Sequence, residues 1–328
     1  MARRTPGLLR GAAVLLAAAA IIAAWHARAD PSRPHRIGVL NEAWAANHPT
    51  VEGLKAGLRA RGLVEGRDVT FEVHFTEGKS GDLPAEVRAL IKANVDLIFT
   101  NNEAAALAAK AATQQIPIVF TLVGNPVAAG VVTDLARPGG NLTGISGGVP
   151  QIVAKRIETL RTITPKLRRV WFIYRSGDPT DMAAVAVAQQ AAKHLKLELI
   201  PRSVESADQL KRTLLEVRPG DGLLSPERDL LDIPVAILGK SLNSRVPAIF
   251  ATAHWVARGG LVSYGPDLYA QGVQASGIVA RILQGARPQD LPVETPDDLA
   301  LAVNLETARL LALEVPRKIL FRADVIQR

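Results

Sequence analysis

The stretch IPIVFTLVGNPVAAGVVTDLARPGGNLTGIS (residues 116–146) joins an apolar run to a segment rich in glycine and small side chains. The apolar half predicts a buried strand over Ile116–Val123. A glycine loop after a strand can cradle phosphate, but Gly139-Gly140 lacks the lysine and hydroxyl of a phosphate loop. The first strand–helix turn, Leu40–Trp44, contains no glycine, so the dinucleotide fingerprint is also absent. Local chemistry therefore predicts a tight turn at Pro138–Asn141 rather than a nucleotide site.

Short apolar runs alternate with longer helical patterns on both sides of this stretch. In the first half we expect strands at Arg36–Leu40, Val69–Phe75, Val95–Thr100 and Ile116–Val123, and helices at Pro49–Arg61, Leu83–Asn94 and Glu103–Thr113. In the second half we expect strands at Val170–Tyr174, Leu197–Pro201, Gly222–Ser225, Ala248–Thr252, Val262–Tyr264 and Leu299–Val303, and helices at Pro179–His194, Ser206–Val217, Leu230–Leu242 and Asp267–Leu283. This order predicts an α/β protein with two lobes, each built on a parallel sheet.

The N-terminus has the layout of a secretory signal peptide. MARRTPGLLR is basic, an apolar stretch of 15 residues follows at 11–25, and Ala27-Arg28-Ala29 forms an A-x-A cleavage site. A membrane anchor is the less favoured alternative, because 15 residues are short for a membrane span. We therefore expect residues 1–29 to be removed and the mature chain to be exported, into the periplasm of a Gram-negative cell.

The composition excludes several classes of function. The chain has 328 residues and no cysteine, which rules out disulfides, zinc–thiolate sites and a thiol nucleophile. We find no serine elbow, no HExxH pattern and no metal-ligand spacing among the histidines, so we expect no catalytic residues, metal or cofactor. Removal of the signal peptide reduces the formal charge from +8 to +4, and no dense basic patch remains to predict nucleic-acid binding.

Polar residues follow most of the predicted strands. Ligands on open parallel sheets bind beyond the carboxyl ends of the strands, and this rule alone selects candidate ligand-binding residues in both lobes. They include Asn41, Glu42, Trp44, Asn101, Asn102, Gly124, Asn125, Arg175, Ser176, Arg228 and His254. Asn101 and Asn102 stand out because two amides at a buried strand end need partners. Trp44 could stack on a ligand or pack against its own lobe, and Arg175 and Arg228 could anchor a carboxylate or lie on the surface.

The opening stretch resembles a signature of the ABC-transporter substrate-binding proteins related to the tryptophan/tyrosine-binding TrpX proteins. The resemblance extends over RIGVL and HPTVEGLKAGLRARGLVEGRDVTFE near the start of the mature chain. It returns in GGLVSYGPDLYAQGVQASGIVARILQGARPQDLPVET and LAVNLETARLLALEVP near the end, and so covers nearly the whole mature chain. By this resemblance Thr252 joins the candidate ligand-binding residues.

The resemblance implies the type I periplasmic-binding-protein fold, with two lobes joined by three crossover strands. The first lobe would comprise residues 35–145 plus 262–293, and the second 146–261 plus 294–328. The opening stretch would then hold the last helix of the first lobe and the first crossover, with a hinge at Gly144–Ser146. The other two crossovers would fall near Leu261–Gly265 and Pro292–Glu294.

The function implied is capture of a small polar ligand, such as an amino acid, and its delivery to an ABC permease and its ATPase by a monomeric protein. A binding protein that presents its ligand to a membrane receptor or kinase remains an alternative, and an exported enzyme or a repressor of the same fold is less favoured. The chain departs from the family at Asn125, at Arg175-Ser176 and at 251–254, where acidic or different residues are common. This loss of acids weakens the case for an ammonium group, and His254 or Arg228 could instead favour an anion.

Overall fold

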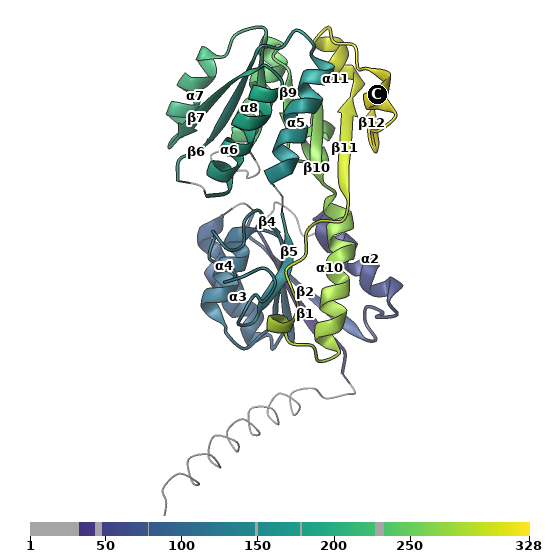
Figure 1. Ribbon diagram of the computed structural model, residues 1–328. Coiled ribbons are helices and arrows are strands. Elements are labelled where there is room, and N and C mark those ends of the chain that lie inside the picture. Colours follow the sequence, from purple (N-terminus) through teal and green to yellow (C-terminus); the bar gives the residue numbers. More distant parts are fainter. Residues whose placement is uncertain (1–32, 43–47, 78, 148–149, 178, 227–232) are drawn as a thin grey trace, which may run out of the picture.

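The computed structural model describes residues 33–42, 48–77, 79–147, 150–177, 179–226 and 233–328. Its first sheet is entirely parallel and has the order β2-β1-β3-β4-β5. The strands are β1 (His35–Asn41), β2 (Val69–Phe75), β3 (Leu97–Thr100), β4 (Ile118–Val123) and β5 (Leu142–Ser146). Four helices cover this sheet: α2 (Pro49–Ala60), α3 (Leu83–Lys92), α4 (Glu103–Ala112) and α10 (Leu268–Leu283). Two apolar clusters show that α2 and α10 pack on one face of the sheet and α3 and α4 on the other (Figure 1).

The second sheet has seven strands in the order β12-β11-β10-β9-β8-β6-β7. They are β6 (Arg169–Arg175), β7 (Glu198–Val204), β8 (Asp221–Leu224), β9 (Ala248–Phe250), β10 (Val262–Pro266), β11 (Leu299–Asn304) and β12 (Val325–Gln327). The helices of this part are α5 (Pro150–Ile163), α6 (Pro179–His194), α7 (Ala207–Glu216), α8 (Ile233–Ser244), α9 (Ala253–Ala257), α11 (Leu305–Leu310) and α12 (Arg317–Leu320). Helices α5 and α6 cover one face, and α7 and α8 the other.

The predicted α/β class is confirmed, and the two sheets with their helices form two lobes (Figure 1). One detail differs, because β11 runs antiparallel to β10 and the second sheet is therefore mixed. We call the part built on the first sheet the first lobe and the part built on the second sheet the second lobe.

The prediction of a helix inside the opening stretch is wrong, because residues 125–141 form turns. A helical turn does begin at Asn125, whose backbone oxygen accepts a hydrogen bond from the Ala129 amide. It ends at once because Gly130 has a φ of +70°, a left-handed conformation that glycine adopts without strain. Gly139 and Gly140 also have positive φ and turn the chain as expected, directly before the strand β5, which the sequence patterns did not reveal.

The chain passes between the lobes three times. The first passage follows β5, and the second follows β10, which pairs only with strands of the second sheet. The second crossing therefore begins after Pro266, next to the predicted Leu261–Gly265, and the third runs from Glu294 to Leu299. The lobe boundaries given above as residue ranges stay a prediction.

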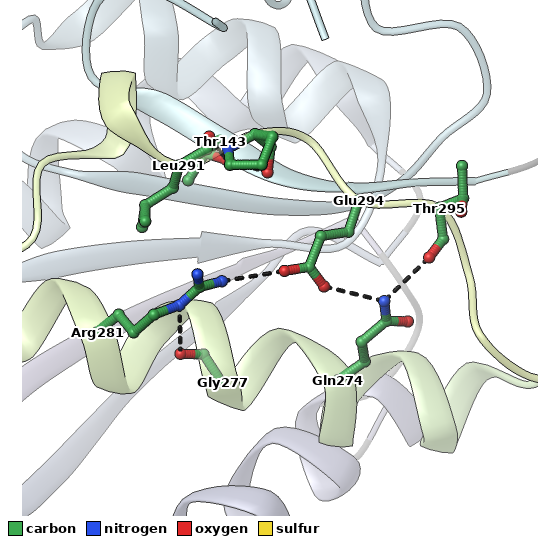
Figure 2. Close-up of polar contacts among 8 residues, drawn as sticks. Thr143, Gln274, Gly277, Arg281, Leu291, Glu294 and Thr295 are labelled. Carbon is green, nitrogen blue, oxygen red and sulfur yellow. Dashed lines mark hydrogen bonds and ion pairs between the residues drawn. The ribbon is translucent and has the colours of Figure 1, made fainter. Parts of the chain in front are cut away.

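Figure 2 shows how the third crossing is attached to the first lobe. The backbone of Glu294 pairs with β5, donating to the Gly144 oxygen and accepting from the Ser146 amide, both at 2.9 Å. Its carboxylate accepts hydrogen bonds from Arg281 and Gln274 of α10, each at 3.0 Å. Gln274 also donates to the Thr295 oxygen at 2.9 Å and accepts from the Asp297 amide at 3.1 Å. The chain is thus fixed to α10 as far as residue 297, two residues before Leu299 pairs with β10.

Helix α10 approaches α2 closely because glycines line the contact. An added carbon at Gly53 of α2 would overlap the backbone oxygen of Tyr269, and one at Gly57 would overlap the Ser276 side chain. On α10, Gly272 lies against the backbone of Thr50 in the same way. The missing side chains let the two backbones meet, and this contact brings the helix that returns from the second lobe onto the first sheet.

We expect Gly53→Ala to destabilise the protein by about 1–3 kcal/mol, because the methyl group must push the two helices apart. Gly239→Ala in α8 is the matched control, since nothing lies within 4 Å of the added carbon there. That control should leave stability unchanged or raise it by up to about 1 kcal/mol. Urea denaturation measures both. Equal stability of the two variants would contradict the close packing.

Candidate functional site

The carboxyl ends of the strands lead to the junction between the lobes in both sheets, except for β11 and β12, which run the other way. Gly124 follows β4 in the first lobe, and Thr180 lies in the first turn of α6 in the second lobe. A side-chain carbon at Gly124 would lie 2.5 Å from the Thr180 methyl group, so the lobes touch at this point. His48 at the start of α2 is also close enough to His254 of α9 for their charges to interact. Residues from both lobes therefore meet where ligands bind on such sheets.

Two predicted residues form a buried pair at the carboxyl ends of β1 and β3. Asn101 donates from its amide nitrogen to the side-chain oxygen of Asn41 at 2.7 Å, and both side chains are buried. The other amide atom of Asn101, Oδ1, is buried and has no hydrogen-bond partner in the described part of the chain. A buried carbonyl oxygen without a donor costs free energy, which makes it a position for a ligand N–H or O–H group.

Three other predicted residues of the first lobe have local structural partners. Asn102 accepts from the Ala105 amide at 2.8 Å and so caps α4, while its own amide nitrogen donates to Glu42. Glu42 also accepts from the Ser80 hydroxyl. Asn125 accepts from the Ala128 amide at 3.1 Å inside its turn. These contacts hold the loops around the junction in place.

The predicted residues of the second lobe lie nearer the solvent. Arg175 and Ser176, at the end of β6, are exposed. Thr252 precedes α9 and is partly buried, and His254 in the first turn of α9 is exposed, with Arg258 in contact with its ring. Trp44 and Arg228 lie outside the described residues.

Burial and neighbouring charges shift both histidines of the junction. Burial, and then the charge of His254, lower the pKa of His48 from 6.5 to about 4. The pKa of His254 is lowered by partial burial and then by Arg258. Nδ1 of His48 accepts from the Thr50 amide at 3.3 Å and lies 2.7 Å from the Thr50 hydroxyl oxygen. The neutral ring is therefore the form that caps α2.

Sequence reasoning missed two buried polar side chains near the junction. Arg156 of α5 is 1% exposed and donates to the backbone oxygens of Tyr264 at 2.6 Å and Ala251 at 3.2 Å. It therefore ties together the ends of β9 and β10. Gln271 of α10 is also 1% exposed, and neither atom of its amide has a partner among the described residues. A polar residue on the core-facing side of an expected helix was the available signal for Gln271.

Comparison with known proteins places this architecture in a family. The sequence model of the family described as ABC transporter substrate binding protein matches residues 44–327. The chain belongs to the ABC transporter substrate-binding protein family. The "Tyrosine-binding protein" of Clostridioides difficile (strain R20291) is 25% identical over 293 residues, which are 88% of this chain and 84% of that protein.

Two solved structures share the fold of this chain and confirm the predicted type I periplasmic-binding-protein fold. A conserved domain protein from Vibrio cholerae is 25% identical, with a TM-score of 0.78 over 90% of this chain and 100% of that one. An ABC domain from Streptococcus pneumonia, solved in complex with L-Trp, is 23% identical, with the same TM-score and coverage.

The family and the names of its relatives describe binding proteins rather than enzymes. Proteins of this substrate-binding family act outside the cytoplasm, in the periplasm or at the cell exterior. Among the helices that the structure describes, none has the length and apolar character needed to cross a membrane.

The low pKa of His48 predicts a pH-dependent stability. Its value of about 6.5 in the unfolded chain exceeds the value of about 4 in the folded protein, so protonation favours unfolding. We expect the free energy of unfolding to fall by up to about 3 kcal/mol as the pH drops from 6.5 to 4. His48→Asn keeps a capping oxygen without the titration and should remove most of this slope. Denaturation at several pH values measures it, and an identical slope in the variant would contradict the assignment.

Gly124→Val should hold the lobes apart, because its side chain collides with Thr180 at the contact point. Overpacking of about 1–3 kcal/mol at this contact corresponds to roughly 5- to 150-fold weaker binding of a ligand that needs the lobes together. Small-angle scattering should show a larger radius of gyration, and Thr180→Ala in the same chain should reverse part of the effect. A variant as compact as the wild type would rule out this contact.

Proposed function

We propose that this protein captures a small polar ligand, an amino acid or a related molecule, between its lobes and delivers it to a membrane permease. The permease would be driven by a cytoplasmic ATPase, as in other ABC importers. The observation that carries the proposal is the unpartnered oxygen of Asn101, held by Asn41 at the point where the lobes meet. The tyrosine-binding relative and the neighbour solved with L-Trp support an amino acid as the ligand class.

Within this proposal the predicted residues take different parts. Asn41 and Asn101 would face the ligand from the first lobe, and Gly124, Thr252 and His254 would line the junction. Glu42, Asn102 and Asn125 would act indirectly by holding the loops through the contacts described above. Arg175 and Ser176, which are exposed, would contact the ligand only at the rim of the junction.

Capture by two lobes explains why binding and closure are coupled. A ligand that touches both lobes stabilises the closed arrangement by its differential affinity for that state. The permease could then distinguish loaded from empty protein by shape. A sensor that presents the closed form to a membrane receptor would use the same physics, so the partner must be identified by a binding experiment.

The mature chain, purified from its source without unfolding, should retain a small molecule that mass spectrometry identifies. We expect L-tyrosine or L-tryptophan added to the stripped protein to raise its melting temperature. Asn101→Ala should weaken the binding at least tenfold, or by about 1.4 kcal/mol, because a buried hydrogen bond to the ligand is lost.

Asn243→Ala in α8 is the control, because Asn243 is exposed and its removal should leave binding unchanged. Binding of a different small molecule, such as an anion, would keep the capture function and change the ligand class. A protein that retains nothing and responds to neither amino acid would contradict the proposal.

A further inference from the structure

Gln271 presents a buried amide with no partner. Its side chain is 1% exposed, and both the nitrogen and the oxygen of the amide lack a hydrogen-bond partner among the described residues. Gln274, one turn further along α10, has bonds to both amide atoms. Leaving a buried amide unpaired costs about 1–3 kcal/mol, so an occupant that supplies a donor and an acceptor would be favoured here.

The helix places Gln271 at the junction end of an apolar layer. Ala275, Ile278 and Ile282 of α10 belong to the cluster that packs on the first sheet. Gln271 lies four residues before Ala275 and therefore on the same face, one turn nearer the second lobe. Helical side chains lean toward the helix N-terminus, which extends this amide still further toward the junction.

The first sheet presents polar residues at the same level. Val39, Phe99 and Val119 belong to the apolar cluster under α2 and α10. Side chains alternate along a strand, so residues two positions further on share this face of the sheet. These residues are Asn41, Asn101 and Thr121, and all three are buried. The layer between α10 and the sheet thus changes from apolar to polar where it reaches the junction.

We propose that Gln271 is a ligand-binding residue that, together with Asn101, recognises a head group carrying both hydrogen-bond donors and acceptors. The Asn101 oxygen and the Gln271 oxygen would accept from the donors, and the Gln271 nitrogen would donate to an acceptor. The ammonium and carboxylate of an α-amino acid meet this requirement, and neutral amides hold them without a fixed charge on the protein. This inference rests on the capture function proposed above and adds the residue that selects the head group.

The same arrangement explains how an α-amino acid could be bound without an acidic partner. The family positions near 125 and 251–254 lack acids in this chain, which argued against an ammonium group at the level of sequence. Uncharged oxygens of Asn101 and Gln271 accept from an ammonium group as well. The unpaired amide makes the empty protein less stable, and the ligand removes that cost on binding.

Gln271→Met separates this role from a structural one, because methionine has a similar shape and no hydrogen-bonding amide. Loss of an unpaired buried amide should raise the melting temperature of the empty protein by about 2–4 °C. The same substitution should weaken binding of L-tyrosine or L-tryptophan at least tenfold, measured by titration calorimetry on the full mature chain. A residue needed only for packing would change in the opposite direction, with lower stability and intact binding.

Gln274→Met is the matched control on the same helix. It removes an amide that is bonded to Glu294, Thr295 and Asp297, so it should lower the melting temperature. Its effect on ligand affinity should be smaller than that of Gln271→Met, because this amide faces the third crossing (Figure 2).

The outcomes separate this inference from the proposed function. If the wild type binds an amino acid and Gln271→Met binds it equally well, the role of Gln271 is wrong and the capture function stands. A lower melting temperature of empty Gln271→Met would also overturn the inference, since the amide would then have partners in solution. If the wild type binds neither amino acid and retains no small molecule, both proposals fail.

Discussion

The contact between α10 and α2 is the constraint on which the rest of the structure depends. Helix α10 leaves the second lobe after β10 and must pack on the first sheet, and it can do so because Gly53, Gly57 and Gly272 let the helices touch. Once α10 is in place, it holds the third crossing through Gln274 and Arg281. The same helix contacts β4 and β5 and places Gln271 at the end of the apolar layer that is nearer the second lobe. Joining the lobes and completing the site are thus consequences of one packing contact.

Each lobe follows the same physical rule as it approaches the junction. Apolar side chains fill the layers between helices and sheets, and buried polar groups lie at the carboxyl ends of several strands next to the junction. In the second lobe Arg156 crosses this boundary and binds the backbone oxygens that end β9 and β10. In the first lobe Asn41 and Asn101 lie at the same boundary, and their side chains form a hydrogen bond with each other. Buried polar groups from both lobes therefore lie at the surface that a ligand would cover.

Much of the fold could be predicted from the sequence, because parallel strands and amphipathic helices have strong periodic patterns. The strand β5 escaped because its residues, LTGIS, are short and follow two glycines rather than a clear apolar run. The candidate site was harder to predict. The rule that ligands bind beyond the carboxyl ends of strands selects the loops, but it does not say which side chains in those loops can contact a ligand. It selected Asn41 and Asn101, which form a buried pair, and also Asn102 and Asn125, whose side chains cap local turns. Gln271 was not predicted because it lies in a helix, α10, and not in a loop after a strand. This helix is also distant in sequence from the first sheet, on which it packs.

Hydrogen–deuterium exchange tests the central claim, that ligand is held between the lobes, most directly. The mature protein as isolated would be compared with the same protein after its small molecule is removed, and again after L-tyrosine and L-tryptophan are added back. The account predicts slower exchange with ligand in segments from both lobes, around Asn101 and Gln271 in the first and around Thr252 in the second. Protection confined to one lobe, or to surfaces away from the strand ends, would contradict it.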